Sequence, residues 1–265
     1  MKNIKIIILA AGEGKRLRPK TANTPKCMIE LFGKTILSHQ IDTSRKLGIE
    51  DISIVTGYKK NKITIPDINY FHNELYSITN MVETFFCAEN KITNSVIVSY
   101  GDIVFEKSVL QKIIDSEHDF SVVIDKQWKS YWGERSTDPL SDAESLKLDE
   151  SGHIIDIGQK TNKIDEIQGQ FIGLMKFQNS AIPLIKYYYK KWKDTAKTGI
   201  NPINPSTSFE KSYMTDFLQG LIKENCKLKA IEIDNGWLEL DSMDDYNLYE
   251  NMEKTKLQKF FNQNL

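Results

Sequence analysis

The chain has 265 residues, of which 40% are hydrophobic and 10% aromatic, so it can fill a sizeable core and is not expected to be disordered. Its 35 basic and 36 acidic residues leave a formal net charge of -1, which argues against whole-surface attraction to nucleic acid or to an anionic membrane. The three cysteines lie far apart without CxxC spacing, which argues against a zinc site and a disulfide framework. The apolar stretch 4–11 is far shorter than the roughly 20 residues of a membrane span. We expect a cytoplasmic protein with no membrane or nucleic-acid partner.

The first elements in the chain alternate between strand and helix. The β-branched run 4–9 is typical of a strand buried on both faces of a parallel sheet, and a glycine-rich turn follows it. Apolar residues at helical spacing predict a helix over 35–47, which Gly48 ends. A strand is expected at 52–57.

This alternation continues with a helix at 81–90, a strand at 95–100, a helix at 107–115 and a strand at 120–124. Strands that alternate with helices in this way predict an α/β fold with a doubly wound, mostly parallel sheet.

The pattern changes after residue 124. Polar and aromatic stretches broken by Gly and Pro predict a lid or insertion over about 125–170, with short strands at 145–148 and 153–157. The rest is expected to form a strand at 171–177, helices at 182–192 and 215–224, a strand at 228–233 and a helix at 244–261. We therefore expect a single domain over 1–265 that carries this lid.

The loop after the first strand is the strongest candidate for a binding site. Gly12 and Gly14 allow the backbone to approach an anion, and Lys15, Arg16 and Arg18 supply positive charge. The loop matches neither GxxxxGK[ST] nor GxGxxG. It predicts a cradle for a nucleoside triphosphate, and the alternative is an ordinary turn with solvated basic residues.

A second motif follows this loop at a spacing that is typical of a known family. Thr24-Pro25-Lys26-Cys27-Met28 stands at the spacing seen in sugar-nucleotide pyrophosphorylases and related nucleotidyltransferases, which the sequence resembles. The resemblance implies a Rossmann-like fold in which the GxGxR loop wraps the triphosphate. It also implies that Lys26 and Arg16 are catalytic, because they stabilise the charge that builds on the phosphates during transfer.

Two aspartates are the candidate metal ligands. A reaction between two anions needs charge neutralisation, which Mg²⁺ held by carboxylates provides. Asp102 follows a predicted central strand, where open α/β sheets place their ligands, and it resembles the metal-binding aspartate of the family. Asp241 resembles the late (D/E)-x-D-(S/T) element. Asp102 could instead be a turn or capping aspartate, and Glu239 could support the site or belong to its rim.

The resemblance also implies which residues contact the nucleotide. The predicted set is Leu9, Ala10, Ala11, Gly12, Gly14, Lys15, Arg16, Lys26, Gly57, Tyr58, Asn80 and Gly101. Asn80 precedes a predicted helix and could equally be its N-cap.

Within this superfamily, the motif GxGxRLxPxTxxxPK, the single Gly-Asp and the late Leu-Asp-Ser resemble the phosphocholine and phosphonate cytidylyltransferase branch. This branch implies transfer of CMP from CTP to a small phosphorylated amine, amino acid or phosphonate, with Mg²⁺ and release of pyrophosphate. An ionised acceptor phosphate needs no general base. The alternatives are a sugar-1-phosphate nucleotidyltransferase that uses UTP, dTTP or GTP, and a non-catalytic nucleotide-binding regulator.

The acceptor side is predicted from aromatic and charged residues. Aromatic faces hold ammonium groups and Arg suits a carboxylate or phosphate, whereas the alternative is that the tryptophans pack the lid and that the aspartate caps a helix. The candidates are Trp128, Trp132, Arg135, Gly173, Asp216 and Trp237. Neither the acceptor nor the oligomeric state follows from the sequence.

Overall fold

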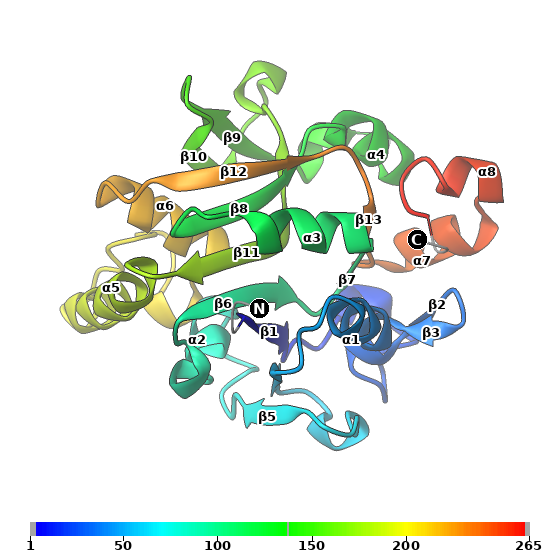
Figure 1. Ribbon diagram of the computed structural model, residues 1–265, viewed down its shortest axis with the longest axis horizontal. Coiled ribbons are helices and arrows are strands. Elements are labelled where there is room, and N and C mark those ends of the chain that lie inside the picture. Colours follow the sequence, from blue (N-terminus) through cyan, green and yellow to red (C-terminus); the bar gives the residue numbers. More distant parts are fainter. Residues whose placement is uncertain (1–3, 137, 263–265) are drawn as a thin grey trace.

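The computed structural model describes residues 4–136 and 138–262, and a nine-stranded sheet forms its centre. In sheet order the strands are β5 (Asn69–His72), β4 (Ile52–Thr56), β1 (Ile4–Ala10), β6 (Ser95–Tyr100), β11 (Gln170–Gln178), β8 (Phe120–Asp125), β12 (Leu228–Ile233), β10 (His153–Lys160) and β9 (Glu144–Leu148). Figure 1 shows the sheet extending from β5 at the bottom of the view to β9 at the top.

Within this sheet, β11 and β10 run antiparallel to their neighbours, and the remaining strands share one direction. The predicted mostly parallel sheet is confirmed. Two small ribbons lie outside it, one of β2 (Glu30–Leu31) and β3 (Lys34–Thr35), the other of β7 (Ile103–Phe105) and β13 (Trp237–Glu239).

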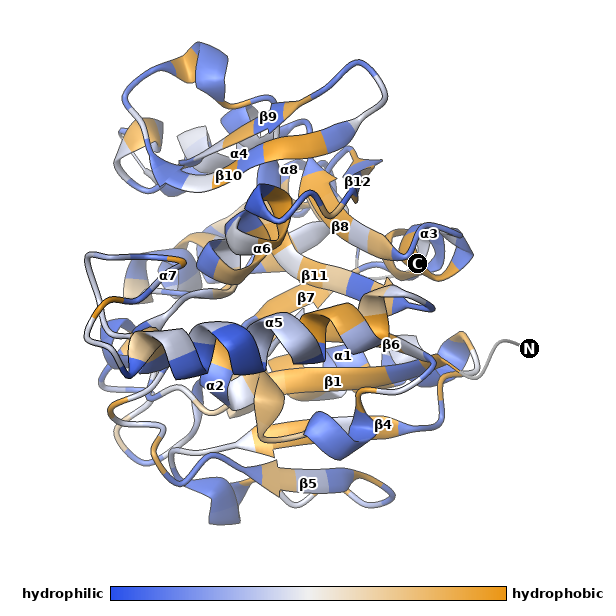
Figure 2. Cartoon of the chain, turned by 90° about the vertical axis from the view of Figure 1, so that its left-hand side faces the viewer, coloured by the Kyte–Doolittle hydropathy of each residue, from blue (hydrophilic) through white to orange (hydrophobic). Residues whose placement is uncertain are grey.

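Helices cover both faces of the sheet because each face is apolar. In β1, Ile6 and Ile8 pack into one hydrophobic cluster and Ile7 and Leu9 into another, as the two-residue period of a strand requires. Figure 2 shows the apolar colour concentrated on the central strands. The helices are α1 (Ile36–Lys46), α2 (Met81–Phe86), α3 (Lys107–Asp115), α4 (Trp128–Arg135), α5 (Ala181–Ala196), α6 (Met214–Lys223), α7 (Met243–Asn251) and α8 (Lys254–Leu257).

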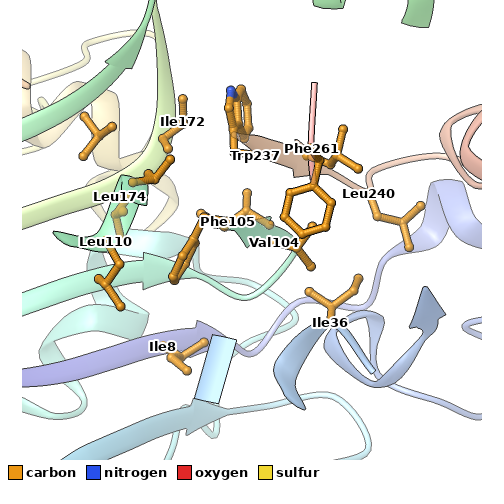
Figure 3. Close-up of a cluster of buried hydrophobic side chains, with 14 of the residues drawn as sticks. Ile8, Ile36, Val104, Phe105, Leu110, Ile172, Leu174, Trp237, Leu240 and Phe261 are labelled. Atoms are coloured by element: carbon orange, nitrogen blue, oxygen red, sulfur yellow. The ribbon is translucent and has the colours of Figure 1, made fainter. Parts of the chain in front are cut away.

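The two hydrophobic clusters divide the helices between the faces. The buried side chains of α1, α3 and α4 belong to the first cluster, and those of α2, α5 and α6 belong to the second. Figure 3 shows part of the first cluster, which includes Ile8 of β1, Leu174 of β11, Phe105 of β7, Trp237 of β13 and Phe261. This arrangement is the doubly wound architecture that the sequence predicted.

Three features of the structure differ from the predicted elements. The tail is not one helix over 244–261, because Met252 is extended and the chain turns so that Leu257, Phe260 and Phe261 become buried. The helix expected over 81–90 ends at Phe86, and a 3₁₀ turn follows at Glu89–Lys91. Strand β5 and helix α4 were not predicted, since β5 is half exposed at a sheet edge and carries no long apolar run.

Segment 125–170, the expected lid or insertion, contains α4, β9 and β10. The strands form an antiparallel hairpin that joins the large sheet where Ile154 of β10 pairs with Leu228 of β12. No helix in the described ranges is both long and apolar enough to cross a bilayer.

Candidate functional site: a cleft at the carboxyl ends of the parallel strands

The site lies where the parallel strands β1, β4 and β6 end. Leu9 pairs with Tyr100 and Ala10 with Thr56, so the loops that follow these strands start at the same edge of the sheet. A cleft of about 110 Å³ opens there. Its walls are formed by Leu9, Ala10, Ala11, Gly12, Lys26, Cys27, Tyr76, Thr79, Asn80, Met81, Thr84, Gly101 and Asp102.

The glycine-rich loop folds tightly against Lys26. Gly14 adopts φ +60°, and a Cβ atom at this position would lie 2.9 Å from the Cβ of Lys26, so the close approach requires glycine. The Thr21 hydroxyl donates to the Gly14 carbonyl at 2.7 Å, and Leu17 is fully buried below the loop. The loop is therefore built as a fixed wall of the cleft.

Lys26 joins the two predicted metal ligands. Its Nζ atom donates to Asp102 Oδ2 at 2.8 Å and to Asp241 Oδ1 at 2.6 Å, and Arg16 forms a second ion pair with Asp241. Burial alone lowers the pKa of Lys26, but the charges of Asp102 and Asp241 outweigh burial and raise this pKa overall. Lys26 therefore remains a cation between two carboxylates that lie far apart in sequence.

Asp102 keeps one oxygen free for a ligand. A Cβ atom on the preceding Gly101 would lie 2.6 Å from the Leu9 carbonyl, so glycine lets the turn press against β1. The buried Oδ1 atom of Asp102 has no hydrogen-bond partner among the residues that the structure describes, which is unusual for a carboxylate. The Leu240 amide donates to the Asp102 carbonyl at 2.9 Å and so places Asp241 beside Asp102.

The metal-binding potential of this place rests on a pair of carboxylates. Across residues 4–136 and 138–262, no three His, Cys, Asp or Glu side chains are arranged to hold a metal ion by themselves. Mg²⁺ is commonly held in proteins by one or two carboxylates together with substrate phosphates. The pair formed by Asp102 and Asp241, with the unpaired Asp102 oxygen, fits that mode of binding.

Glu239 belongs to the same charged cluster. Its carboxylate lies 2.7 Å from Arg135 Nη1, and its side chain is 24% exposed. Burial, together with the charges of Asp102 and Asp241, raises the pKa of Glu239 to about 7, although Arg135 acts in the opposite direction. The sequence left the role of Glu239 open. In the structure its carboxylate lies close enough to Asp102 and Asp241 for their charges to act on it, and it is paired with Arg135.

Several other predicted nucleotide residues support the cleft rather than line it. The Tyr58 amide donates to the Ala11 carbonyl at 3.0 Å, and its hydroxyl donates to the carbonyls of Thr21 and Ala22. Gly57 lies against Ala11 and the Tyr76 ring. These residues fix the loop from outside.

Asn80 and Lys15 differ in their surroundings. Asn80 lines the cleft, and its side chain also accepts a hydrogen bond from the Met81 amide at 2.9 Å as the N-cap of α2. The side chain of Lys15 is 70% exposed and lies 3.5 Å from Glu13. Lys15 is thus the least constrained of the predicted basic residues.

Sequence reasoning missed one wall of the cleft. Tyr76, Thr79, Met81 and Thr84 line it from the segment that follows β5. Because β5 runs parallel to β4, its carboxyl end delivers this segment to the same edge of the sheet. Recognising residues 69–72 as an edge strand would have pointed to this wall.

The tryptophans predicted to hold the acceptor are part of the core. Trp128 is 2%, Trp132 5% and Trp237 2% exposed. Their rings pack around Tyr131 and one another with centroids 5.3–6.4 Å apart. Mutual packing buries these rings, as the alternative interpretation of the sequence expected, and a contact with the acceptor stays a prediction.

Arg135, Asp216 and Gly173 are also engaged within the protein. The Arg135 side chain is 7% exposed and paired with Glu239 and Asp245, so it does not present its charge to an acceptor. Asp216 accepts from the Tyr213 amide and from Asn204, and it completes the capping box of α6. Gly173 lies against the Tyr100 ring, where a Cβ atom would approach within 2.6 Å.

The model of the MobA-like NTP transferase domain matches residues 6–154, which include the loop, Lys26 and Asp102. The chain belongs to this nucleotidyltransferase family. The predicted family and the enzyme class are thereby confirmed.

Similar curated proteins cover most of this chain. The chain is 40% identical over 251 residues to the CTP:phosphoglutamine cytidylyltransferase of Campylobacter jejuni, a match that spans 90% of this chain and 96% of the relative. It is 32% identical over 123 residues to the choline-phosphate cytidylyltransferase of Streptococcus pneumoniae, spanning 45% of this chain and 53% of the relative. The bifunctional protein GlmU of Methanocaldococcus jannaschii is 29% identical, over 87% of this chain and 50% of the relative.

Solved structures show the same fold. The CTP:phosphocholine cytidylyltransferase LicC from Streptococcus pneumoniae matches with a TM-score of 0.73 at 23% identity, over 94% of this chain and 99% of that one. The inositol-1-phosphate CTP transferase from T. maritima matches with a TM-score of 0.67 at 20% identity, over 94% of this chain and 96% of that one. The Rossmann-like nucleotidyltransferase fold is confirmed.

Proposed function

We propose that this protein transfers CMP from CTP to a small phosphorylated acceptor of the phosphoglutamine type, with Mg²⁺ and release of pyrophosphate. The observation that carries the proposal is the cluster of Lys26, Asp102 and Asp241 at the cleft beside the glycine-rich loop. The two carboxylates suit a metal ion that would neutralise polyphosphate charge, and Lys26 and Arg16 beside them suit the phosphate oxygens.

Similarity supports the choice of nucleotide and acceptor. The relative that acts on phosphoglutamine matches 90% of this chain, whereas the choline-phosphate relative matches 45%. Both relatives are named as cytidylyltransferases. CTP is therefore the favoured nucleotide, and phosphoglutamine is favoured over phosphocholine.

The charge beyond Asp102 supports an acceptor that carries an ammonium group. The carboxyl groups of Glu144, Asp102, Glu239 and Asp216 all lie close enough to the buried Tyr100 side chain to act on its charge, so acidic groups gather on this side of the site. An amino group of an amino-acid acceptor would be attracted to this negative potential. A phosphorylated amino acid has both this group and the attacking phosphate.

The metal would be held by Asp102 and Asp241, since their charge and the unpaired Asp102 oxygen suit a hard cation. Bound Mg²⁺ supplies neutralisation and orientation of the triphosphate. Arg16 and Lys26 provide the remaining positive charge near Asp241, and the loop around Gly14 fixes their positions.

The chemical step needs no base from the protein. An acceptor phosphate oxygen, ionised at neutral pH because its second pKa is about 6, attacks the α-phosphorus of CTP. A new P–O bond forms, and the bond between the α-phosphorus and the bridging oxygen breaks. That oxygen keeps the electron pair and leaves as part of pyrophosphate. Lys26 stabilises the negative charge that shifts towards the leaving group.

A matrix of substrates tests the proposal. Pyrophosphate release is measured with CTP, UTP, dTTP and GTP, each combined with phosphoglutamine, phosphocholine and a sugar 1-phosphate in the presence of Mg²⁺. We expect the highest kcat/KM with CTP and phosphoglutamine. A preference for a sugar 1-phosphate with UTP, dTTP or GTP would establish the alternative activity, and no release with any pair would favour a non-catalytic regulator.

A further inference from the structure

Asp241 stands on a short piece of structure that the large sheet does not hold. It follows β13, which within residues 4–136 and 138–262 pairs only with β7, through Trp237 with Phe105 and Glu239 with Ile103. An isolated two-stranded ribbon is marginally stable and needs packing to hold its position. The position of Asp241 relative to Asp102 therefore depends on what lies behind β13.

Two tyrosines hold the backbone of Glu239 from behind. The Glu239 amide donates to the Tyr131 hydroxyl of α4 at 2.8 Å, and the Tyr249 hydroxyl of α7 donates to the Glu239 carbonyl at 2.8 Å. The two hydroxyls also lie 2.5 Å apart. Both peptide groups of this residue are thus fixed by side chains from two helices.

Arg135 connects the same helices to Asp241. Its Nη1 atom donates to Glu239 at 2.7 Å, and its Nε and Nη2 atoms donate to the two carboxylate oxygens of Asp245 at 2.8 and 3.2 Å. Asp245 Oδ2 in turn accepts from the amides of Asp241 and Ser242, each at 2.9 Å. One guanidinium is therefore two hydrogen bonds from the backbone of Asp241.

The surroundings of Arg135 suit a fixed support. The carbon Cζ of its guanidinium lies 5.2 Å from the centroid of the Trp132 ring and 5.4 Å from that of Tyr131. Its side chain is 7% exposed and that of Asp245 is 5% exposed. A planar guanidinium can bind two carboxylates and stack on aromatic rings at once, which a lysine ammonium cannot reproduce.

We propose that Arg135 is a positioning residue that holds Asp241 in place for the metal, through Asp245 on one side and Glu239 on the other. This inference rests on the proposed function, in which Asp102 and Asp241 hold Mg²⁺. The side chain of Arg135 is only 7% exposed and is paired with Glu239 and Asp245, so its effect would reach the metal through these two carboxylates. The buried aromatic cluster of α4 would then serve the reaction by carrying this arginine.

The test uses the full chain and compares Arg135→Lys with the wild type. Binding of Mn²⁺ without nucleotide is followed by the loss of the EPR signal of free aqueous Mn²⁺, and pyrophosphate release is measured over a range of Mg²⁺ concentrations. Losing an outer partner of a metal ligand typically weakens binding by about 10–100-fold. We expect a loss of that size in Mn²⁺ affinity, a similar rise in the Mg²⁺ requirement, and recovery of kcat at high Mg²⁺.

Three further variants keep the test decisive. Tyr249→Phe removes only the hydroxyl that donates to Glu239, so it should fold and should weaken Mn²⁺ binding by less than Arg135→Lys. If Arg135→Lys does not fold, Asp245→Asn carries the test, because it removes the charge of the carboxylate through which Arg135 reaches the Asp241 backbone. Lys176→Met is the matched control, because this buried lysine donates to carbonyls at the end of α3 and its loss should lower the melting temperature without changing Mn²⁺ affinity.

The outcomes separate the inference from the function. Mn²⁺ affinity equal to that of the wild type in folded Arg135→Lys and Tyr249→Phe, or in Asp245→Asn if Arg135→Lys does not fold, would overturn the positioning role and leave the proposed metal pair intact. A wild type that binds no Mn²⁺ and shows no dependence on Mg²⁺ would overturn the metal pair itself, and the positioning role with it.

Discussion

The sequence offered candidate binding residues for both the nucleotide and the acceptor. In the structure, the nucleotide candidates lie at the cleft, whereas most acceptor candidates are buried in the core. On the nucleotide side, Lys26 and Asp102 meet at the cleft as expected. On the acceptor side, Trp128, Trp132 and Arg135 are buried in scaffold. The conformation of a loop after a strand is set by its local sequence. The orientation of a tryptophan ring is instead set by the tertiary packing around it.

The largest effect is expected from removing the cation on the nucleotide side. Lys26→Met should reduce kcat/KM for pyrophosphate release by about 10²–10³-fold, as the loss of a group that stabilises transition-state charge typically does. Lys15→Met is the control, because Lys15 is 70% exposed and should cost far less activity. Equal losses in the two variants would mean that the loop acts only through its overall charge.

On the acceptor side, removal of a buried ring should affect stability first. Trp128→Ala should lower the free energy of unfolding by about 3–5 kcal/mol, because Trp128 is only 2% exposed and fills the core. Urea unfolding measures this loss, and Tyr187→Ala, at a residue 58% exposed, should change little. A rise in the KM of the acceptor with unchanged stability would show instead that Trp128 contacts the acceptor.

Between the two sides, Glu239 offers a test by pH. Its pKa rises from an ordinary 4.5 to about 7, so the folded protein holds a proton that the unfolded chain releases in this window. This contribution to stability is fully present below pH 4.5 and is lost as the pH rises through 7, with a slope of at most about 1.4 kcal/mol per pH unit.

Glu239→Gln removes the titration of this group. Urea unfolding over the same window should show a flatter decline in stability for the variant than for the wild type. Parallel curves for the two proteins would show that Glu239 keeps an ordinary pKa.

The smallest expected effect sharpens the role of Asn80. Asn80→Ala removes the cap of α2 and should cost about 1 kcal/mol of stability, whereas Asn80→Ser keeps a capping oxygen and should cost less. If the amide also contacts the nucleotide, the KM of CTP rises in both variants. If Asn80 is only a cap, the KM of CTP stays near the wild-type value in Asn80→Ser.

The fold was largely predictable because its strands are long apolar runs. Residues 107–115 and 228–233 were expected with the limits that the structure shows. The unpredicted strand β5 is half exposed, so its pattern gave little signal, and without it the cleft wall at Tyr76 and Thr79 was hidden. Local patterns thus sufficed for the buried strands.

The residues of the candidate site could be predicted where they belong to a family motif. Residues outside such motifs were harder to assign from the sequence. Lys26 and Asp241 are far apart in the chain, and the family motif alone suggested that they meet. The role of Arg135 could not follow from its neighbours in sequence, because its partners Glu239 and Asp245 come from β13 and α7. Such a network exists only once several elements have packed.

The most direct test of the whole account compares Asp102→Asn, Asp241→Asn and the double variant in pyrophosphate release from CTP, Mg²⁺ and phosphoglutamine. Residues that hold one ion act as a unit, so their effects should not add. We predict that each single variant loses about 10²-fold or more in kcat and that the double variant loses little beyond that. Full activity in either folded single variant would contradict the account.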